Sequence, residues 1–107
     1  MANNYKNSKV DLTATTVTTL YTAPSATTSI VKSIIVSNDS SSNETITLTI
    51  TNSSSAIFSV YKNEEVGALS SVELLKQPLV VLETEILKVT ASTANKLHVI
   101  ASYLEVS

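Results

Sequence analysis

Apolar and hydroxyl side chains alternate strictly in the middle of the chain. The run TITLTIT, residues 45–51, places an apolar side chain at every second position and threonines between them. A period of two residues is typical of a β-strand with one face in the core. We therefore predict a strand over residues 45–51, and its predicted core face consists of Ile46, Leu48 and Ile50.

The threonine face of this strand allows three interpretations. It is an ordinary solvent-exposed face, a docking face for a neighbouring subunit, or part of an ice-binding array of T-x-T repeats. Such an array needs several stacked strands with the same pattern, whereas the sequence contains one. The solvent-exposed face is favoured, and the docking hypothesis names Thr45, Thr47 and Thr49 as candidate partner contacts.

The longest β-branched run, residues 30–36, predicts a central strand. Pro24 indicates a turn before it, because proline fixes its own φ and pushes the preceding residue into an extended conformation. Apolar residues occupy both faces of the run, which is typical of a strand covered on both sides. The predicted faces are Ile30, Ile34 and Val36 on one side and Val31 and Ile35 on the other.

The final run, residues 97–106, also carries apolar side chains on both faces. We predict a second strand that is either central or covered by an interface. Two strands of this kind exceed what one small sandwich needs to bury, and monomers seldom expose large contiguous apolar patches. The sequence therefore predicts a homo-oligomer.

The remaining segments complete an all-β pattern of seven or eight short strands. A strand at a sheet edge is predicted over residues 13–20, and residues 56–61 are predicted to form a hairpin with residues 45–51. Two further strands are predicted over residues 79–82 and 86–91. Residues 67–78 fit either a short helix or, alternatively, a strand or irregular crossing. We prefer the strand or irregular crossing, because Pro78 limits any helix to about ten residues and isolated helices that short are marginal. Many short strands at this spacing indicate a single antiparallel β-sandwich, either jelly-roll or immunoglobulin-like.

One domain, residues 11–107, is predicted to follow a polar arm, residues 1–10. The predicted core of this domain comprises Ile34, Val36, Ile46, Leu48, Ile50, Phe58, Val60, Leu87, Val89, Val99 and Ala101. The arm has too little apolar content to fold alone, so it is either a disordered tail or a segment that is ordered by a partner, and we expect the latter. In that hypothesis Tyr5 is an apolar anchor, and Lys6 and Lys9 face an acidic surface.

Composition and charge exclude several classes of partner. The basic residues are seven lysines with no arginine, and the net charge is −2, whereas nucleic-acid binding calls for clustered lysine and arginine. We therefore expect no nucleic-acid partner. No apolar run approaches the length of a membrane span, and the first residues contain no apolar signal region, so we expect no membrane partner.

No arrangement of residues in the sequence indicates catalysis, a metal site or a cofactor. His98 is the one histidine, and cysteine is absent, so neither a recognisable triad nor a zinc site can be assembled readily. Asn38, Asp39, Asn43 and Glu44 offer oxygens, but they lack the spacing of a calcium loop, and a solvated turn is the favoured reading. Paired glutamates at 64–65 and at 83 and 85 are interpreted as charged turns.

Two stretches resemble one family of proteins. LYTAPSATTSIVKSIIVSN, residues 20–38, and KLHVIASYLEV, residues 96–106, resemble small β-sandwich structural proteins encoded among the virion genes of tailed bacteriophages. The resemblance implies a non-enzymatic virion protein, made in the host cytoplasm and bound to the major capsid protein or other virion proteins. The present chain differs from this family at residues 83–85, where it lacks the Gly-Asp turn that the resemblance implies.

Within that family the favoured role is a capsid decoration or cement protein that bridges capsomers. The resemblance to cement proteins implies a trimer. A neck, tail or fibre component is the alternative virion role. A carbohydrate-binding module uses the same fold but stacks aromatic side chains on sugar rings, and the chain has no tryptophan and one phenylalanine, so this class is less favoured.

Overall fold

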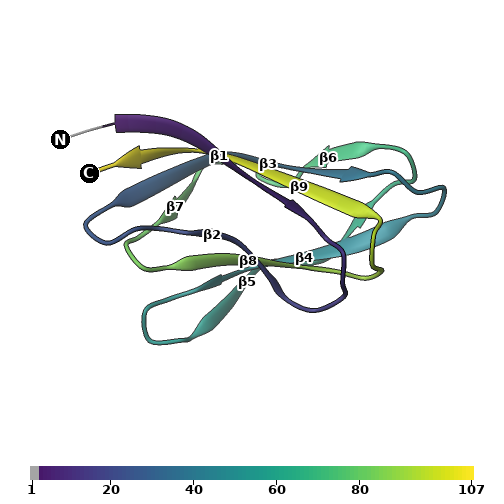
Figure 1. The fold of residues 1–107 in the computed structure, drawn as a ribbon, viewed down its shortest axis with the longest axis horizontal. Helices are drawn as coiled ribbons and strands as arrows, with labels where there is room; N and C mark the ends of the chain where they lie inside the picture. Colours follow the sequence, from purple (N-terminus) through teal and green to yellow (C-terminus); the bar gives the residue numbers. More distant parts are fainter. Residues whose placement is uncertain (1–2) are drawn as a thin grey trace.

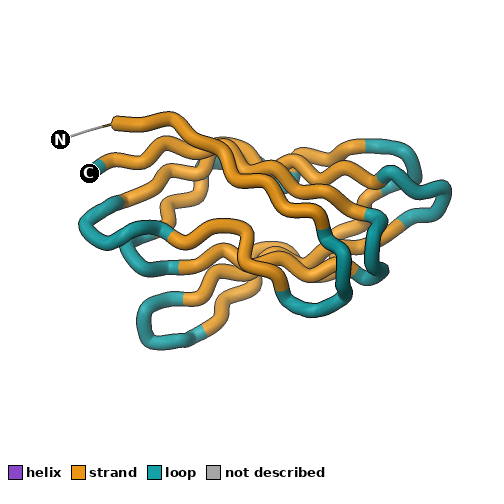
Figure 2. Tube along the Cα trace, in the orientation of Figure 1, coloured by secondary structure: helices purple, strands orange, loops and turns teal. Residues whose placement is uncertain are grey.

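The computed structural model describes residues 3–107, which form two packed β-sheets (Figure 1). The strands of this part of the chain are β1 (Asn3–Asp11), β2 (Thr18–Thr22), β3 (Thr28–Asn38), β4 (Glu44–Thr51), β5 (Ile57–Val66), β6 (Ser71–Glu73), β7 (Leu79–Val81), β8 (Ile86–Ala91) and β9 (Leu97–Val106). All the strand pairs are antiparallel, and the described residues include no helix (Figure 2). The prediction of an antiparallel β-sandwich is confirmed.

The sheets have the strand order of a jelly roll. The five-stranded sheet runs β1-β9-β3-β6, with β7 also paired to β3, and the four-stranded sheet runs β2-β8-β4-β5. The chain is thus a long hairpin rolled up from its β4–β5 tip, so that β3 pairs with β6 and β7, β2 with β8, and β1 with β9. Jelly rolls are built from two sheets in this way, and the immunoglobulin-like alternative is excluded by the order.

Residues 3–10 of the predicted arm lie in β1, at one edge of the five-stranded sheet. The whole of β1 pairs with β9, from Asn3 opposite Val106 to Asp11 opposite His98. Ladder hydrogen bonds join backbone groups, so a polar segment needs no apolar pattern to form such an edge strand. Met1 and Ala2 lie outside the described residues. The expectation that the arm attaches to a partner stays a prediction.

The faces predicted for β3 were wrong, although its central position between β9 and the pair β6 and β7 is confirmed. A register shift between Val31 and Ser33 inserts an extra residue into β3, and a bulge reverses the face of all positions beyond it. Val31 therefore shares the buried face with Ile34 and Val36, while Ile35 is 40% exposed. Within one copy, the strand is covered on one side.

Most of the predicted core is buried. The confirmed positions are Ile34, Val36, Ile46, Leu48, Leu87, Val89, Val99 and Ala101. Ile50 and Val60 are partly buried and pack against this core. The pattern missed buried residues outside regular alternation, such as Leu12 and Leu74 in loops.

Phe58 was wrongly assigned to the core and is 56% exposed. The hairpin of β4 and β5 forms as predicted, but register shifts on both sides of Leu48 interrupt it. Phe58 lies opposite Ile50 near the turn, and this end of the hairpin extends away from the five-stranded sheet (Figure 1). A side chain on the inner face is not buried where no second sheet lies over it.

Two less regular segments differ from their predictions in extent. The predicted edge strand at 13–20 is observed as β2 at the edge of the four-stranded sheet, but it begins at Thr18. Before it, Leu12 is held by backbone bonds, donating to the carbonyl of Leu97 and accepting from the amide of Asn95. Residues 71–73 form the short strand β6, which confirms the preference for strand over helix.

The β7–β8 turn has threonine where the backbone favours glycine. Thr84 has a φ of 65°, a left-handed conformation that is strained for a β-branched residue. We expect Thr84→Gly to raise the free energy of unfolding by about 0.5–1 kcal/mol, because relief of strain exceeds the added chain entropy. Chemical denaturation measures this change. Thr90→Gly in β8 is the matched control and should destabilise; a loss of stability in both variants would contradict the strain argument.

Candidate functional site

Five of the six candidate contact residues, all except Lys6, lie on the two outer faces of the sandwich. Tyr5 and Lys9 lie opposite Leu104 and Ile100 of β9, which alternate with buried residues and so point outward. Directly opposed side chains share a face, so both residues belong to the outer face of the five-stranded sheet. The candidate threonines of β4 alternate with its inward-facing residues, so they lie on the outer face of the four-stranded sheet. They are Thr45, Thr47 and Thr49.

The outer face of the five-stranded sheet, here called the apolar face, carries two cross-strand rows. The first row crosses four strands and runs Tyr5, Leu104, Ile30 and Val80. The second row runs Lys9, Ile100, Ile35 and Glu73. Tyr5 is 76% exposed and Ile35 and Ile100 are each 40% exposed. This face therefore presents adjacent apolar side chains with a cation at one edge and an anion at the other.

The outer face of the four-stranded sheet, here called the threonine face, is polar. Thr47 lies opposite Thr90, and Thr49 lies opposite Lys88, which in turn lies opposite Thr19. The Thr47 hydroxyl accepts a hydrogen bond from the amide of Asn63 at 3.1 Å. Lys88 interrupts the threonines, so a regular T-x-T array does not form across these strands. The two faces differ in chemistry, one apolar and the other rich in hydroxyls.

Lys6 points to the other side of β1 and forms an ion pair within the chain. Its Nζ lies 2.9 Å from Oε1 of Glu105, whose other oxygen accepts a hydrogen bond of 2.6 Å from the Tyr21 hydroxyl. Tyr21 also bonds to Ser29, and its ring packs against that of Tyr103 with centroids 4.1 Å apart. These residues form a polar network in which Tyr21, Ser29, Tyr103 and Glu105 are buried and Lys6 is about half exposed.

Hydrogen bonding and burial shift the pKa values of the ionisable groups in this network. The bond from Tyr21, followed by that from Lys6, holds the pKa of Glu105 below its usual value, and burial together with the carboxylate raises the pKa of Tyr21. The bond to Glu105 raises the pKa of Lys6. The network was missed in the sequence, although Glu105 occurs in phase with the core residues of the last strand, which signals a buried carboxylate that needs donors.

His98 lies between two carboxylates on the outer side of β9. Its Nε2 is 3.2 Å from Oδ1 of Asp11, and its Nδ1 is 3.2 Å from Oδ2 of Asp39. All three side chains are substantially exposed, and exposed contacts of this kind contribute little to stability. Among residues 3–107, no group of three or more His, Cys, Asp and Glu side chains could hold a metal ion.

The oxygens considered for calcium hold a loop together instead. Asn38 accepts hydrogen bonds from Ser40 and donates to the carbonyls of Ser42 and Val66. Glu44 accepts from Ser42 and Ser92, and hydrogen bonds from hydroxyls, that of Thr93 first, keep its pKa below the usual value. The interpretation of residues 38–43 as a polar turn agrees with these bonds.

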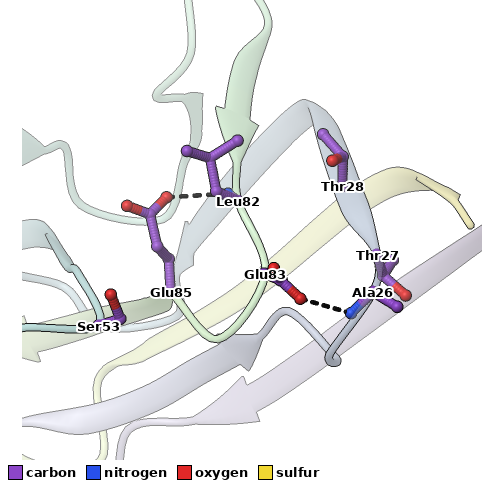
Figure 3. A pocket seen from close by; sticks show the side chains of 7 residues that line it. All are labelled: Ala26, Thr27, Thr28, Ser53, Leu82, Glu83 and Glu85. Atoms are coloured by element: carbon purple, nitrogen blue, oxygen red, sulfur yellow. Dashed lines mark hydrogen bonds between the residues drawn. The ribbon is translucent and has the colours of Figure 1, made fainter.

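A pocket of about 490 Å³ lies where three turns meet at one end of the sandwich (Figure 3). Glu83 and Glu85 line it, and both carboxylates accept backbone hydrogen bonds, from Ala26 at 2.7 Å and from Leu82 at 2.8 Å. Its other lining residues are Ala26, Thr27, Thr28, Ser53 and Leu82. The two glutamates thus fix the surrounding turns, in keeping with their interpretation as turn residues.

Comparisons with known proteins support the fold. No family model and no curated protein matches the chain. A solved structure of Bacillus endospore appendages, a family of disulfide-linked pili, is 10% identical with a TM-score of 0.60, covering 99% of this chain and 87% of that one. A structure of infectious bursal disease virus strain Gx is 14% identical with a TM-score of 0.54, covering 95% of this chain and 33% of that one. These identities are low, so the similarity is one of fold.

Within the described residues, no helix is long and apolar enough to cross a membrane. The candidate functional features of the described residues are surfaces. They consist of the apolar face, the threonine face and the turns at the two ends of the sandwich.

Proposed function

We propose that this chain is a non-enzymatic structural protein of a tailed-bacteriophage particle, and that it decorates the capsid by bridging neighbouring capsomers. The observation that carries the proposal is a jelly roll with two extended outer faces of different chemistry. The fold is shared with a pilus protein and a viral structure, and residues 20–38 and 96–106 resemble small virion proteins. Together these observations favour a building block over a catalyst.

Bridging requires contact area and no chemistry. A protein that binds two neighbouring capsomers opposes their separation, and standard contacts of about 1,600 Å² repeated at every equivalent seam add up over the shell. We assign the capsid contact to the threonine face, around Thr45, Thr47 and Thr49. Hydroxyl groups on a sheet can exchange water for hydrogen bonds to a polar capsid surface, and such wet interfaces are common.

The partner in this proposal is the major capsid protein, and the location is the mature virion. A neck, tail or fibre position is the alternative, because the same faces would fit a ring as well as a shell. Copy number separates these two positions. A decoration protein occurs once per capsomer or per seam, whereas a neck or tail component occurs in a small fixed ring.

The test is to measure the occupancy of purified particles. Particles from cells that lack this chain, mixed with the purified protein, should bind it at capsid seams in many copies, as seen by quantitative mass spectrometry and electron microscopy. Thr47→Lys should reduce this occupancy by at least about tenfold, since a buried lysine without a partner costs several kcal/mol. The matched control is Thr13→Lys, in the exposed loop before β2.

Two outcomes would contradict the decoration role. A small fixed copy number at the neck or tail would favour the alternative position. Failure of the protein to bind any particle would exclude a role as a virion protein. If Thr47→Lys binds as well as the unchanged protein, the threonine face is not the capsid contact.

A further inference from the structure

The apolar face is self-complementary when two copies meet face to face. Consider a two-fold axis that lies between the two facing sheets, runs parallel to the strands and passes between β9 and β3. This rotation places β9 of one copy over β3 of the other, and β1 of one copy over β6 and β7 of the other. Each cross-strand row then meets its own reversed copy. Such a symmetric contact uses the same patch on both partners.

The apolar rows match under this operation. Tyr5 and Leu104 of one copy face Val80 and Ile30 of the other, because these four residues form one row. In the second row Ile100 faces Ile35. The apolar side chains that one copy leaves exposed on this face therefore cover each other.

The charges match as well. Lys9 at one end of the second row faces Glu73 at the other end, and the pair occurs twice by symmetry. Glu73 accepts hydrogen bonds from the amides of Ile34 at 2.8 Å and Leu75 at 3.1 Å and from the Ser33 hydroxyl. A carboxylate has about four acceptor sites, so one remains for the lysine.

The remaining charged groups on the apolar face meet uncharged partners. Asp11 and His98 share a row with Ser37 and Ser71, so the operation places them opposite these serines. Lys32, at the bulge of β3, comes over Ser102 of β9. Like charges do not face each other anywhere among these groups.

The area agrees with a stable contact. The long strands β1, β9 and β3 and the three-residue strands β6 and β7, spaced about 4.8 Å apart at about 3.3 Å per residue, cover about 570 Å² per copy, or about 1,100 Å² in total. A specific interface needs about 1,000 Å² or more. Two sheets packed face to face also form the ordinary aligned arrangement of a sandwich.

We infer that two copies of this chain form a two-fold dimer through their apolar faces. The dimer presents its two threonine faces outward on opposite sides, so one dimer has two identical surfaces for partners. This inference does not depend on the proposed place in a virion, because it concerns the isolated protein. It differs from the trimer that the family resemblance implies.

Sedimentation equilibrium of the full chain, over about 1 µM to about 1 mM, tests the dimer. The unchanged protein should show a monomer–dimer equilibrium in this range. Lys9→Glu and Glu73→Lys should each raise the dissociation constant by at least about tenfold, because each places two like-charged pairs across the contact. Thr47→Lys, on the threonine face, is the control and should leave the dissociation constant unchanged.

Mixing the two charge variants gives the sharpest result. In a mixed dimer, the carboxylate introduced at position 9 faces the ammonium introduced at position 73, and the native Glu73 faces the native Lys9. The equimolar mixture should therefore recover the dimer that each variant alone has lost. Ile100→Lys provides a second disruption at an exposed position if Glu73→Lys fails to fold, and it should give a monomer.

Several results would overturn the inference. If the protein is still a monomer at about 1 mM, the proposed dimer contact does not form. If its mass is that of a trimer, the two-fold arrangement is excluded. An unchanged dissociation constant for Lys9→Glu, or a mixture that stays monomeric, would show that Lys9 and Glu73 do not face each other.

Discussion

Leu48→Ala is expected to lower the free energy of unfolding by about 2–5 kcal/mol, because it removes a fully buried side chain and leaves a cavity. Leu48 has no exposed surface and lies in β4, opposite Val89 of β8 and Tyr61 of β5. Small domains have total stabilities of about 5–15 kcal/mol, so this one substitution removes a large share. Urea denaturation followed by circular dichroism measures the change.

Thr49→Ala is the matched control for Leu48→Ala. Thr49 is the next residue of the same strand and lies on the threonine face, so its loss should cost less than about 1 kcal/mol. A denaturation midpoint that moves for Thr49→Ala and not for Leu48→Ala would mean that the two faces of β4 are reversed.

Stability is also expected to fall in acid because of Glu105. Its folded pKa is lower than its usual value of 4.5, so the carboxylate contributes stability that is fully present above the unfolded pKa. That contribution is lost as the pH falls through the lowered folded pKa. Glu44, whose pKa is also lowered, acts in the same direction. Thermal denaturation between about pH 7 and pH 2 should show the loss below about pH 5.

Tyr21→Phe tests the donor side of this network. The substitution removes the 2.6 Å hydrogen bond to Glu105 and leaves a buried carboxylate with one donor fewer, so we expect a loss of about 1–3 kcal/mol at neutral pH. Glu105→Gln should flatten the decline in acid, whereas Glu65→Gln, at an exposed glutamate of β5, should leave it unchanged. An acid profile that is the same in Glu105→Gln would contradict the assignment.

Alternation predicted those strands whose pattern is regular. β4, β8 and β9 were found near their predicted bounds, with Leu48, Leu87 and Val99 in the core. Alternation cannot show a bulge, because the extra residue is chosen by pairing with a distant strand. For this reason the faces of β3 were assigned incorrectly beyond Val31.

The features of the candidate surfaces were less accessible from the sequence. Their apolar rows join strands from both ends of the chain, as in the row of Tyr5, Leu104 and Ile30. The pairing of Lys6 with Glu105 depends on the same long-range register. Local patterns predict which way a side chain points, but the strand order determines its neighbours.

The pairing of the first strand with the last also constrains how the chain folds. β1 and β9 lie side by side (Figure 1), with Asn3 at the start of β1 paired to Val106 at the end of β9. The five-stranded sheet therefore lacks the strand between β1 and β3 until β9 has been synthesised. Proteins dominated by such distant pairings fold in about milliseconds to seconds. β9 must therefore be made before this sheet can form, and until then β1 and β3 each have an unpaired edge on the side where β9 will bind.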